Sequence, residues 1–265
     1  RVRFSSDFPN FETRPAAAII KHTNPCGAAF GSDLTEAFQR AWRGDPQAAF
    51  GGIVALSGNV DKALAHAIAH GEKFLEVIIA PTFTDEAKSV LTDRWKNIRL
   101  LAVGNDPRRE HWQQFRSISG GFLTQSAVPI VANVSNWELM AGPKPSEKMR
   151  NDAAIAWITC AHLKSNSISI VSNGSLIGSG MGQVDRVSAA NLAIQRARIS
   201  LSEANNPVAG SDAFFPFPDG PKLLIDAGIK CIVQPGGSVR DQETIDVCEH
   251  AGVALLHTGE RCFRH

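Results

Sequence analysis

Short apolar runs alternate with segments of helical periodicity along most of this chain, and this alternation limits its fold more than any other feature. Strand-like runs are expected at residues 16–20, 53–56, 74–80, 98–103, 167–172, 176–177, 230–233 and 254–257. Helices are expected at 34–42, 61–69, 84–91, 146–161, from 186 onward, 221–227 and 241–251. Residues 104–140 are less regular, with β-like pieces near 121–124 and 128–131. This order predicts an α/β fold with a largely parallel or mixed sheet.

Residues 142–145, Gly-Pro-Lys-Pro, form the strongest boundary signal in the sequence. Proline and glycine interrupt regular structure, and Ser146 follows them as the expected N-cap of a helix with a clean apolar stripe. We therefore expect two subdomains, residues 1–145 and 146–265. Glycines at the ends of an apolar strand in each half hint that the two are alike.

The composition is that of a globular protein, with 43% apolar and 20% charged residues among 265. A formal net charge of +1 provides no general field for nucleic acid or an anionic membrane, so neither partner is expected. No apolar stretch approaches the ~20 residues of a membrane span. Five widely spaced cysteines, an odd number, favour a cytoplasmic location over a disulfide framework.

A Lys-His pair at the end of the first strand-like run is the main candidate for an active site. Lys21 and His22 lead into a turn marked by Pro25 and Gly27. Imidazole, with an ordinary pKa near ~6.5, can accept a proton from a weak nucleophile at neutral pH. A lone histidine is more often structural, and Lys21 can equally be a solvated charge. Both interpretations stay open at this point.

A second unusual turn, residues 211–220, combines three phenylalanines with two aspartates. Its functional interpretation is a ligand-binding surface that partners the Lys-His turn. The structural alternative is a hydrophobic plug, in which Phe214 and Phe217 belong to the core and Asp219 caps the next helix.

Common metal and nucleotide motifs are incomplete in this sequence. A zinc nucleobase deaminase needs His-x-Glu and Pro-Cys-x-x-Cys, but Asn24 replaces the glutamate and Ala29 the second cysteine. Residues 178–183 lack the third glycine of a dinucleotide fingerprint. The glycines there either let backbone N–H groups approach a ligand oxygen or form a tight hairpin turn. We expect no bound metal.

Taken in order, these motifs resemble the transformylase domain of the bifunctional purine-biosynthesis family that joins an AICAR formyltransferase to an inosinate cyclohydrolase. The resemblance covers residues 16–265 and rests on residues 20–27, 45–52, 76–81, 164–167, 177–186, 211–219, 234–238 and 261–265. It implies two cytidine-deaminase-like subdomains, three-layer α/β/α units without zinc. It also implies a homodimer whose active sites use both subunits.

The resemblance implies formyl transfer from 10-formyltetrahydrofolate to the 5-amino group of AICAR (aminoimidazole carboxamide ribonucleotide), which gives FAICAR in purine biosynthesis. This amine is a poor nucleophile because its lone pair is delocalised into the ring and carboxamide, so a base is needed. By resemblance His22 is that base, and Lys21 orients it or the formyl group. Asn166 would hold the formyl oxygen as charge develops on it.

Other implied site residues lie further along the chain. Phe214, Phe217 and Asp219 belong to the folate side, Arg186 and Arg261 to ligand anions or backbone positioning, and His265 to closing the site. The sequence departs from the family because the cyclohydrolase domain and a nucleotide-holding Arg-Tyr-Gly segment are missing, and no tyrosine occurs. We expect no inosinate formation. The alternatives are a nucleotide- or folate-binding remnant and a formyltransferase for another amine.

Overall fold

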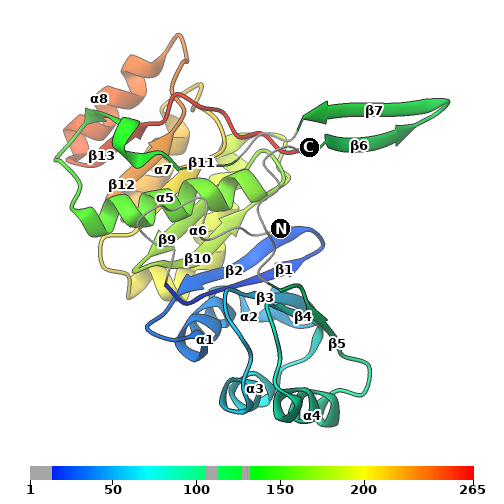
Figure 1. The fold of residues 1–265 in the computed structure, drawn as a ribbon. Coiled ribbons are helices and arrows are strands. Elements are labelled where there is room, and N and C mark those ends of the chain that lie inside the picture. The colour runs from blue at the N-terminus through cyan, green and yellow to red at the C-terminus, as the bar shows by residue number, and fades with distance from the viewer. Residues whose placement is uncertain (1–13, 105–112, 127–129, 131) are drawn as a thin grey trace.

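The computed structural model describes residues 14–104, 113–126, 130 and 132–265 (Figure 1). One mixed sheet of eleven strands runs through both halves of the chain in the order β5-β4-β3-β1-β2-β10-β9-β11-β12-β13-β8. Helices pack against it, and a separate hairpin, β6-β7, projects from the body. The predicted α/β class with a mixed sheet is confirmed.

The element bounds agree with the expected segments where one was predicted, but Asn24–Phe30, Pro46–Ala49, Gln113–Ile118, Glu138–Ala141 and Val208–Ser211 were not predicted. The strands are β1 Ala16–Lys21, β2 Asn24–Phe30, β3 Gly52–Leu56, β4 Leu75–Ala80, β5 Arg99–Ala102, β6 Gln113–Ile118, β7 Gly121–Ser126, β8 Glu138–Ala141, β9 Ile168–Ser172, β10 Ser175–Gly180, β11 Val208–Ser211, β12 Cys231–Gln234 and β13 Ala254–His257. The helices are α1 Leu34–Gly44, α2 Pro46–Ala49, α3 Lys62–Ala69, α4 Asp85–Arg94, α5 Glu147–His162, α6 Arg186–Ser202, α7 Asp219–Asp226 and α8 Asp241–Ala251, with a 3-10 turn at Val134–Asn136.

Polar side chains start several helices where the sequence predicts. Asp33, Asp61 and Ser146 each accept a hydrogen bond from a backbone N–H in the first turn of the following helix. Such caps satisfy N–H groups that have no partner inside the helix.

The two halves of the sheet repeat one topology. In the first half, β1 and β2 form an antiparallel hairpin, and β3 pairs antiparallel with the other edge of β1. Strands β4 and β5 then continue the sheet parallel to β3. In the second half, β9 and β10 form the hairpin, β11 pairs antiparallel with β9, and β12 and β13 continue the sheet parallel to β11. The inner strands β2 and β10 meet antiparallel at Ala29 and Ser175. The repeat supports two similar subdomains, although the boundary at residue 145 stays a prediction; β8, which precedes it, pairs with β13.

Close helix-strand contacts explain glycines that the sequence left ambiguous. A Cβ at Gly27 of β2 would lie 2.0 Å from Ala41 O of α1, and one at Gly180 of β10 would lie 2.0 Å from Ala189 O of α6. Gly178 similarly faces Ala193. Gly178 and Gly180 lie within strand β10, where the lack of a side chain lets helix α6 pack closely on the strand. They are therefore part of neither a hairpin turn nor a ligand-binding loop.

Strand β2 was not predicted, because Pro25 and Gly27 were interpreted as a turn. Pro25 lies where the β1-β2 register shifts between Ile19 and Ile20. An irregularity of this kind is a position at which a strand tolerates proline. The turn is therefore shorter than expected, and the strand begins at Asn24.

Helix α5 lies in the interior instead of presenting a single apolar stripe. All residues from Asp152 to Ala161 are buried. The sheet covers one side, and Ile130, Val134 and Trp137 pack against the same cluster, with Trp137 and Trp157 ring centroids 6.2 Å apart. On the opposite face of the sheet α6, α7 and α8 surround a separate core.

The irregular region contains the hairpin. The β-like piece at 121–124 corresponds to β7. The piece at 128–131 lies outside the described residues, apart from Ile130.

Candidate functional site

The Lys-His turn is a two-residue hairpin loop at the end of β1. Lys21 pairs with Asn24, and the two residues between them, His22 and Thr23, have φ values of 48° and 66°. Two consecutive positive φ angles are characteristic of the type I′ turns that join tightly twisted strands. His22 is exposed at the tip, so its imidazole is accessible from solvent.

The segment before β3 holds the side chain of Lys21 in place. Its Nζ donates to the carbonyl oxygen of Phe50 at 2.6 Å. Gly51, at φ 71°, leaves space for this contact, because a Cβ there would lie 2.8 Å from Lys21 Nζ. The predicted glycine pair at this strand end therefore shapes the site.

Hydrogen bonds attach the Lys-His turn to the second half of the chain. Asn24 Oδ1 accepts from Lys164 N at 3.0 Å, while Asn24 Nδ2 donates to His22 O at 3.1 Å. Arg264 Nη1 donates to Thr23 O at 3.0 Å. His22 and Asn166, separated by most of the chain, are thus held on adjoining loops.

The Asn166 loop is fixed against the end of β10. Asn166 donates from its backbone N and from Nδ2 to Gln183 O, at 3.0 and 2.9 Å. Gly182 N donates to Lys164 O at 2.7 Å. An amide NH₂ carries two hydrogens, and among the described residues Nδ2 of Asn166 has one acceptor, so its second hydrogen can donate to a ligand oxygen.

A buried ion pair adjoins this loop. Arg186 Nη2 lies 3.1 Å from Asp212 Oδ1, and Asp212 is fully buried. Within the described part of the chain, Arg186 Nε and Asp212 Oδ2 are buried without a hydrogen-bond partner. Such atoms are costly to leave unpaired, so they indicate a place for a polar ligand group or water.

The last residues of the sequence run past this ion pair. Cys262 N donates to Asp212 O at 3.0 Å. The Arg186 guanidinium lies 6.0 Å from the Phe263 ring centroid, and Phe263 stacks on His265 at 5.8 Å. Arg186 and His265 therefore belong to one cluster.

The aromatic turn divides into two parts. Arg261 lies over the Phe214 ring, 4.8 Å from its centroid, whereas Phe217, 49% exposed, is covered by Arg240 at 4.7 Å. Asp219 is the first residue of α7 and accepts from Gly220 N at 2.9 Å. Phe217 and Asp219 thus lie at the start of α7.

The plug alternative was wrong about which residues are buried. The buried ring of this turn is Phe215, 1% exposed, and Pro218 instead of Asp219 is the N-cap of α7. Local sequence cannot distinguish adjacent phenylalanines, because their burial depends on the direction in which the turn enters the sheet.

Sequence reasoning missed two residues that connect the site. Arg264 joins the turn to the Asn166 loop, and Asp212 holds Arg186. Both fall within motifs that support the family resemblance, yet their partners are distant in sequence.

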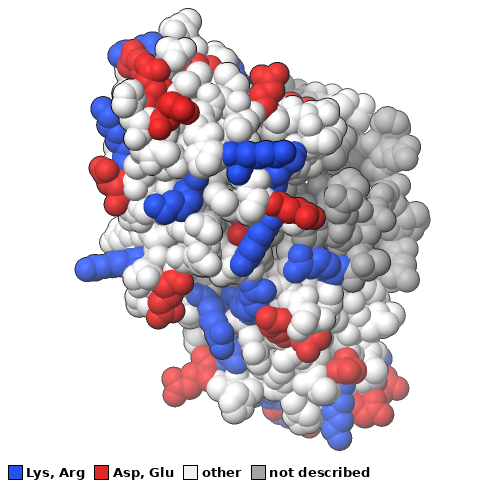
Figure 2. All heavy atoms as spheres, turned by 90° about the vertical axis from the view of Figure 1, so that its left-hand side faces the viewer, with Lys and Arg blue, Asp and Glu red and all other residues white. Residues whose placement is uncertain are grey.

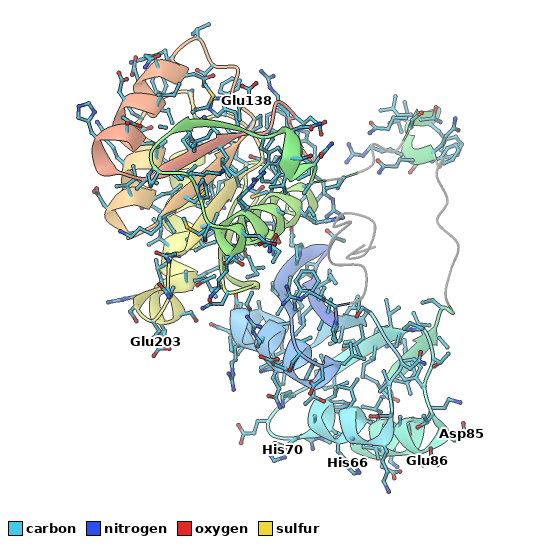
Figure 3. The ribbon with its side chains drawn as sticks, turned by 60° about the vertical axis from the view of Figure 1, so that its left-hand side comes forward. His66, His70, Asp85, Glu86, Glu138 and Glu203 are labelled. Atoms are coloured by element: carbon cyan, nitrogen blue, oxygen red, sulfur yellow. The ribbon has the colours of Figure 1, made fainter. Side chains whose placement is uncertain are left out.

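The cysteine that follows the Lys-His turn is buried. Burial raises the pKa of Cys26, which follows the turn, to about 12, so its thiol stays protonated at neutral pH. No group of three or more His, Cys, Asp or Glu side chains that could hold a metal occurs in the described ranges. Figure 3 shows His66 on α3, His70 directly after it, and Asp85 and Glu86 on α4, at the outer edge of the first half.

The surface agrees with the balanced composition. Acidic and basic side chains are interspersed on the face that Figure 2 shows. None of the helices described is both long enough and apolar enough to cross a bilayer. All five cysteines are free thiols.

Known proteins resemble this chain over most of its length. A model of the AICARFT/IMPCHase bienzyme family matches residues 3–196. Proteins named bifunctional purine biosynthesis protein PurH from Cutibacterium acnes, Anoxybacillus flavithermus and Oceanobacillus iheyensis are 44%, 42% and 39% identical to it. Each match covers 95% of this chain and 48% of the relative. The chain thus spans about half the length of the curated relatives it matches.

Proposed function

Because the chain belongs to the AICARFT/IMPCHase bienzyme family, we propose that it transfers a formyl group from 10-formyltetrahydrofolate to the 5-amino group of AICAR, giving FAICAR. The observation that carries this proposal is the attachment of the Lys-His turn to the Asn166 loop. The relatives are named for purine biosynthesis and match nearly the whole chain, which favours a biosynthetic enzyme over a binding remnant.

In the proposed reaction His22 is the general base. It takes a proton from the amine of AICAR as the nitrogen forms a bond to the formyl carbon. The formyl oxygen gains negative charge in the tetrahedral intermediate, where the free Nδ2 hydrogen of Asn166 donates to it. The bond to the folate nitrogen then breaks, and the protonated imidazole returns its proton to that leaving nitrogen.

The other site residues have proposed binding roles. Lys21, held at Phe50 O, orients His22 or the formyl group. Arg186 Nε and Asp212 Oδ2, two buried atoms that have no hydrogen-bond partner in the described ranges, would contact a polar ligand group. Phe214, Phe217 and Asp219 form the folate side. Arg261, over the Phe214 ring, holds a ligand anion or positions the backbone, and His265, stacked on Phe263, closes the site.

Substitution of the predicted base tests the reaction directly. We expect His22→Ala to lower kcat for formyl transfer by roughly 100-fold or more, the usual range for loss of a general base. His66→Ala, which removes an exposed imidazole from α3, is the matched control and should keep full activity. Unchanged turnover in folded His22→Ala protein contradicts the proposal.

A homodimer is proposed as the working assembly, and the β6-β7 hairpin supports it. The strand register places Phe115 and Phe122 on one face and Ile118 and Leu123 on the other. Phe115 is 68% and Phe122 71% exposed. A lone two-stranded hairpin is marginally stable in water, so an apolar partner on both faces stabilises it. A second copy of the chain is the proposed partner.

Molar mass in solution tests the dimer. We expect twice the chain mass by light scattering, and a shift toward the monomer in the double variant Phe115→Ser/Phe122→Ser. A monomeric wild-type protein that transfers formyl groups at full rate contradicts this proposal.

The finer fold and location are also proposals. The repeated order of hairpin and parallel strands supports two cytidine-deaminase-like, three-layer subdomains. The five free thiols support a cytoplasmic location.

A further inference from the structure

Arg264 lies where three segments of the candidate site meet. Its backbone N–H donates to Ser165 Oγ at 2.9 Å, and its carbonyl oxygen accepts from Ser165 N at 2.9 Å. These two bonds fix the backbone of Arg264 beside the residue that precedes Asn166.

The guanidinium of Arg264 joins the other two segments. Nη1 donates to Thr23 O at 3.0 Å, in the turn that carries His22, and also to His162 O at the end of α5. The last carbonyls of a helix lack intrahelical partners and carry partial negative charge, so a guanidinium is a favourable partner there. Its donors have fixed directions, so it also sets the position of the turn relative to α5.

We propose that Arg264 is a positioning residue that holds the Lys-His turn at the separation from Asn166 that formyl transfer requires. The inference rests on the proposed function. Arg264 touches protein carbonyls and acts through His22. A displacement of about 1 Å at a reacting group can cost on the order of 100-fold in rate, so loss of this contact should affect kcat.

Kinetics of three variants test the positioning role. We expect Arg264→Ala to lower kcat by roughly 10- to 100-fold with little change in KM for either substrate. Arg264→Lys should retain an intermediate kcat, because an ammonium reaches one carbonyl but lacks the planar fork. Methylguanidinium added to Arg264→Ala should restore part of kcat, while the wild-type rate stays constant. Arg198→Ala, an exposed arginine of α6, is the control.

Folded Arg264→Ala with wild-type kcat, or with a loss confined to KM, overturns the proposal. Hydrogen-deuterium exchange supplies a readout that needs no activity. We expect faster exchange in peptides covering residues 21–24 and 163–167 of Arg264→Ala, and no change in Arg198→Ala. If the wild-type protein transfers no formyl group, the proposed function fails, and unchanged exchange at the turn separately overturns the role of Arg264. Arg264→Lys serves for both measurements if the alanine variant does not fold.

Discussion

His22 and Thr23 occupy backbone conformations that most residues avoid. Their φ values, 48° and 66°, lie in the left-handed region, which is especially unfavourable for β-branched threonine. The equivalent turn of the second half, between β9 and β10, uses Asn173 and Gly174 at 55° and 75°. Asn-Gly is the sequence that this turn type favours. The first-half turn therefore carries residues that fit this conformation poorly, a cost in stability that agrees with the proposed role of His22.

Exchanging the turn sequence should separate stability from activity. We expect the double variant His22→Asn/Thr23→Gly to raise the free energy of unfolding by about 1 kcal/mol, because both new residues adopt positive φ more readily. The same variant should lose formyl transfer. Urea unfolding and a turnover assay measure the two effects. A less stable variant contradicts the strain argument, and an active one contradicts the role of His22.

Gly51 provides a second test at the scale of single residues. Gly51→Ala places a Cβ against Lys21 Nζ at a positive φ, so both strain and displacement of Lys21 are expected. We expect a stability loss of about 1 kcal/mol and a fall in kcat. Gly252→Ala, also at positive φ but with open space around it, is the matched control and should lose stability only. Equal kcat in the two variants argues against a role for the Lys21 contact.

At the scale of elements, α5 is connected to the second hairpin turn by a buried carboxylate. Asp152, 3% exposed, accepts from Asn173 N at 2.9 Å and from Gly174 N at 2.6 Å. Gly174 O in turn accepts from Phe30 N at 3.0 Å in β2. A single helix side chain therefore supports the junction between the two halves of the sheet.

Removal of one acceptor should weaken this junction. Asp152→Asn leaves an amide NH₂ facing a backbone N–H, and an unpaired buried donor costs about 1–3 kcal/mol. We expect the free energy of unfolding to fall by that amount, measured by urea denaturation. Asp226→Asn, at the end of α7, is a control of the same chemistry and should change stability little. Equal stabilities would falsify the structural role of Asp152.

At the scale of the whole molecule, the site lies where the two repeats meet. The β2-β10 contact brings the turn of the first hairpin to the end of β10 and the start of β9. His162, half-buried at the end of α5, accepts from Arg264 at its carbonyl oxygen, and desolvation, more than nearby positive charges, lowers the pKa of its imidazole from 6.5 to about 4. Folding therefore favours the neutral imidazole.

This lowered pKa predicts a pH-dependent stability. Between pH 6.5 and about 4 the unfolded chain binds a proton at His162 that the folded chain does not. The stabilising contribution is fully present above pH 6.5 and is lost as the pH falls through this range. We expect His162→Gln to show a smaller decrease in urea midpoint between pH 7 and 4 than the wild type. His66→Gln should follow the wild type, and equal slopes in all three proteins contradict the prediction.

Sequence patterns predicted the site only in part. Lys21, His22 and Asn166 lie on attached loops, and Phe214, Arg186, Arg261 and His265 surround the Asp212 segment. Their catalytic and binding roles stay predictions. Phe217 and Asp219 lie in the predicted turn, but Phe217 contacts Arg240 at the start of α8, and Asp219 accepts from Gly220 within α7. The role of Arg264 could not be predicted, because its acceptor Thr23 lies 241 residues earlier.

The sequence alone determined most helices and strands, several of their caps and the family, because periodicity, capping side chains and short motifs act over a few neighbouring residues. Only the tertiary structure decided that the two hairpins join in one sheet, that Phe215 is the buried ring and that Arg264 reaches the Lys-His turn. These features depend on contacts between distant segments. Such contacts form only after the strands have paired, and no local pattern records them.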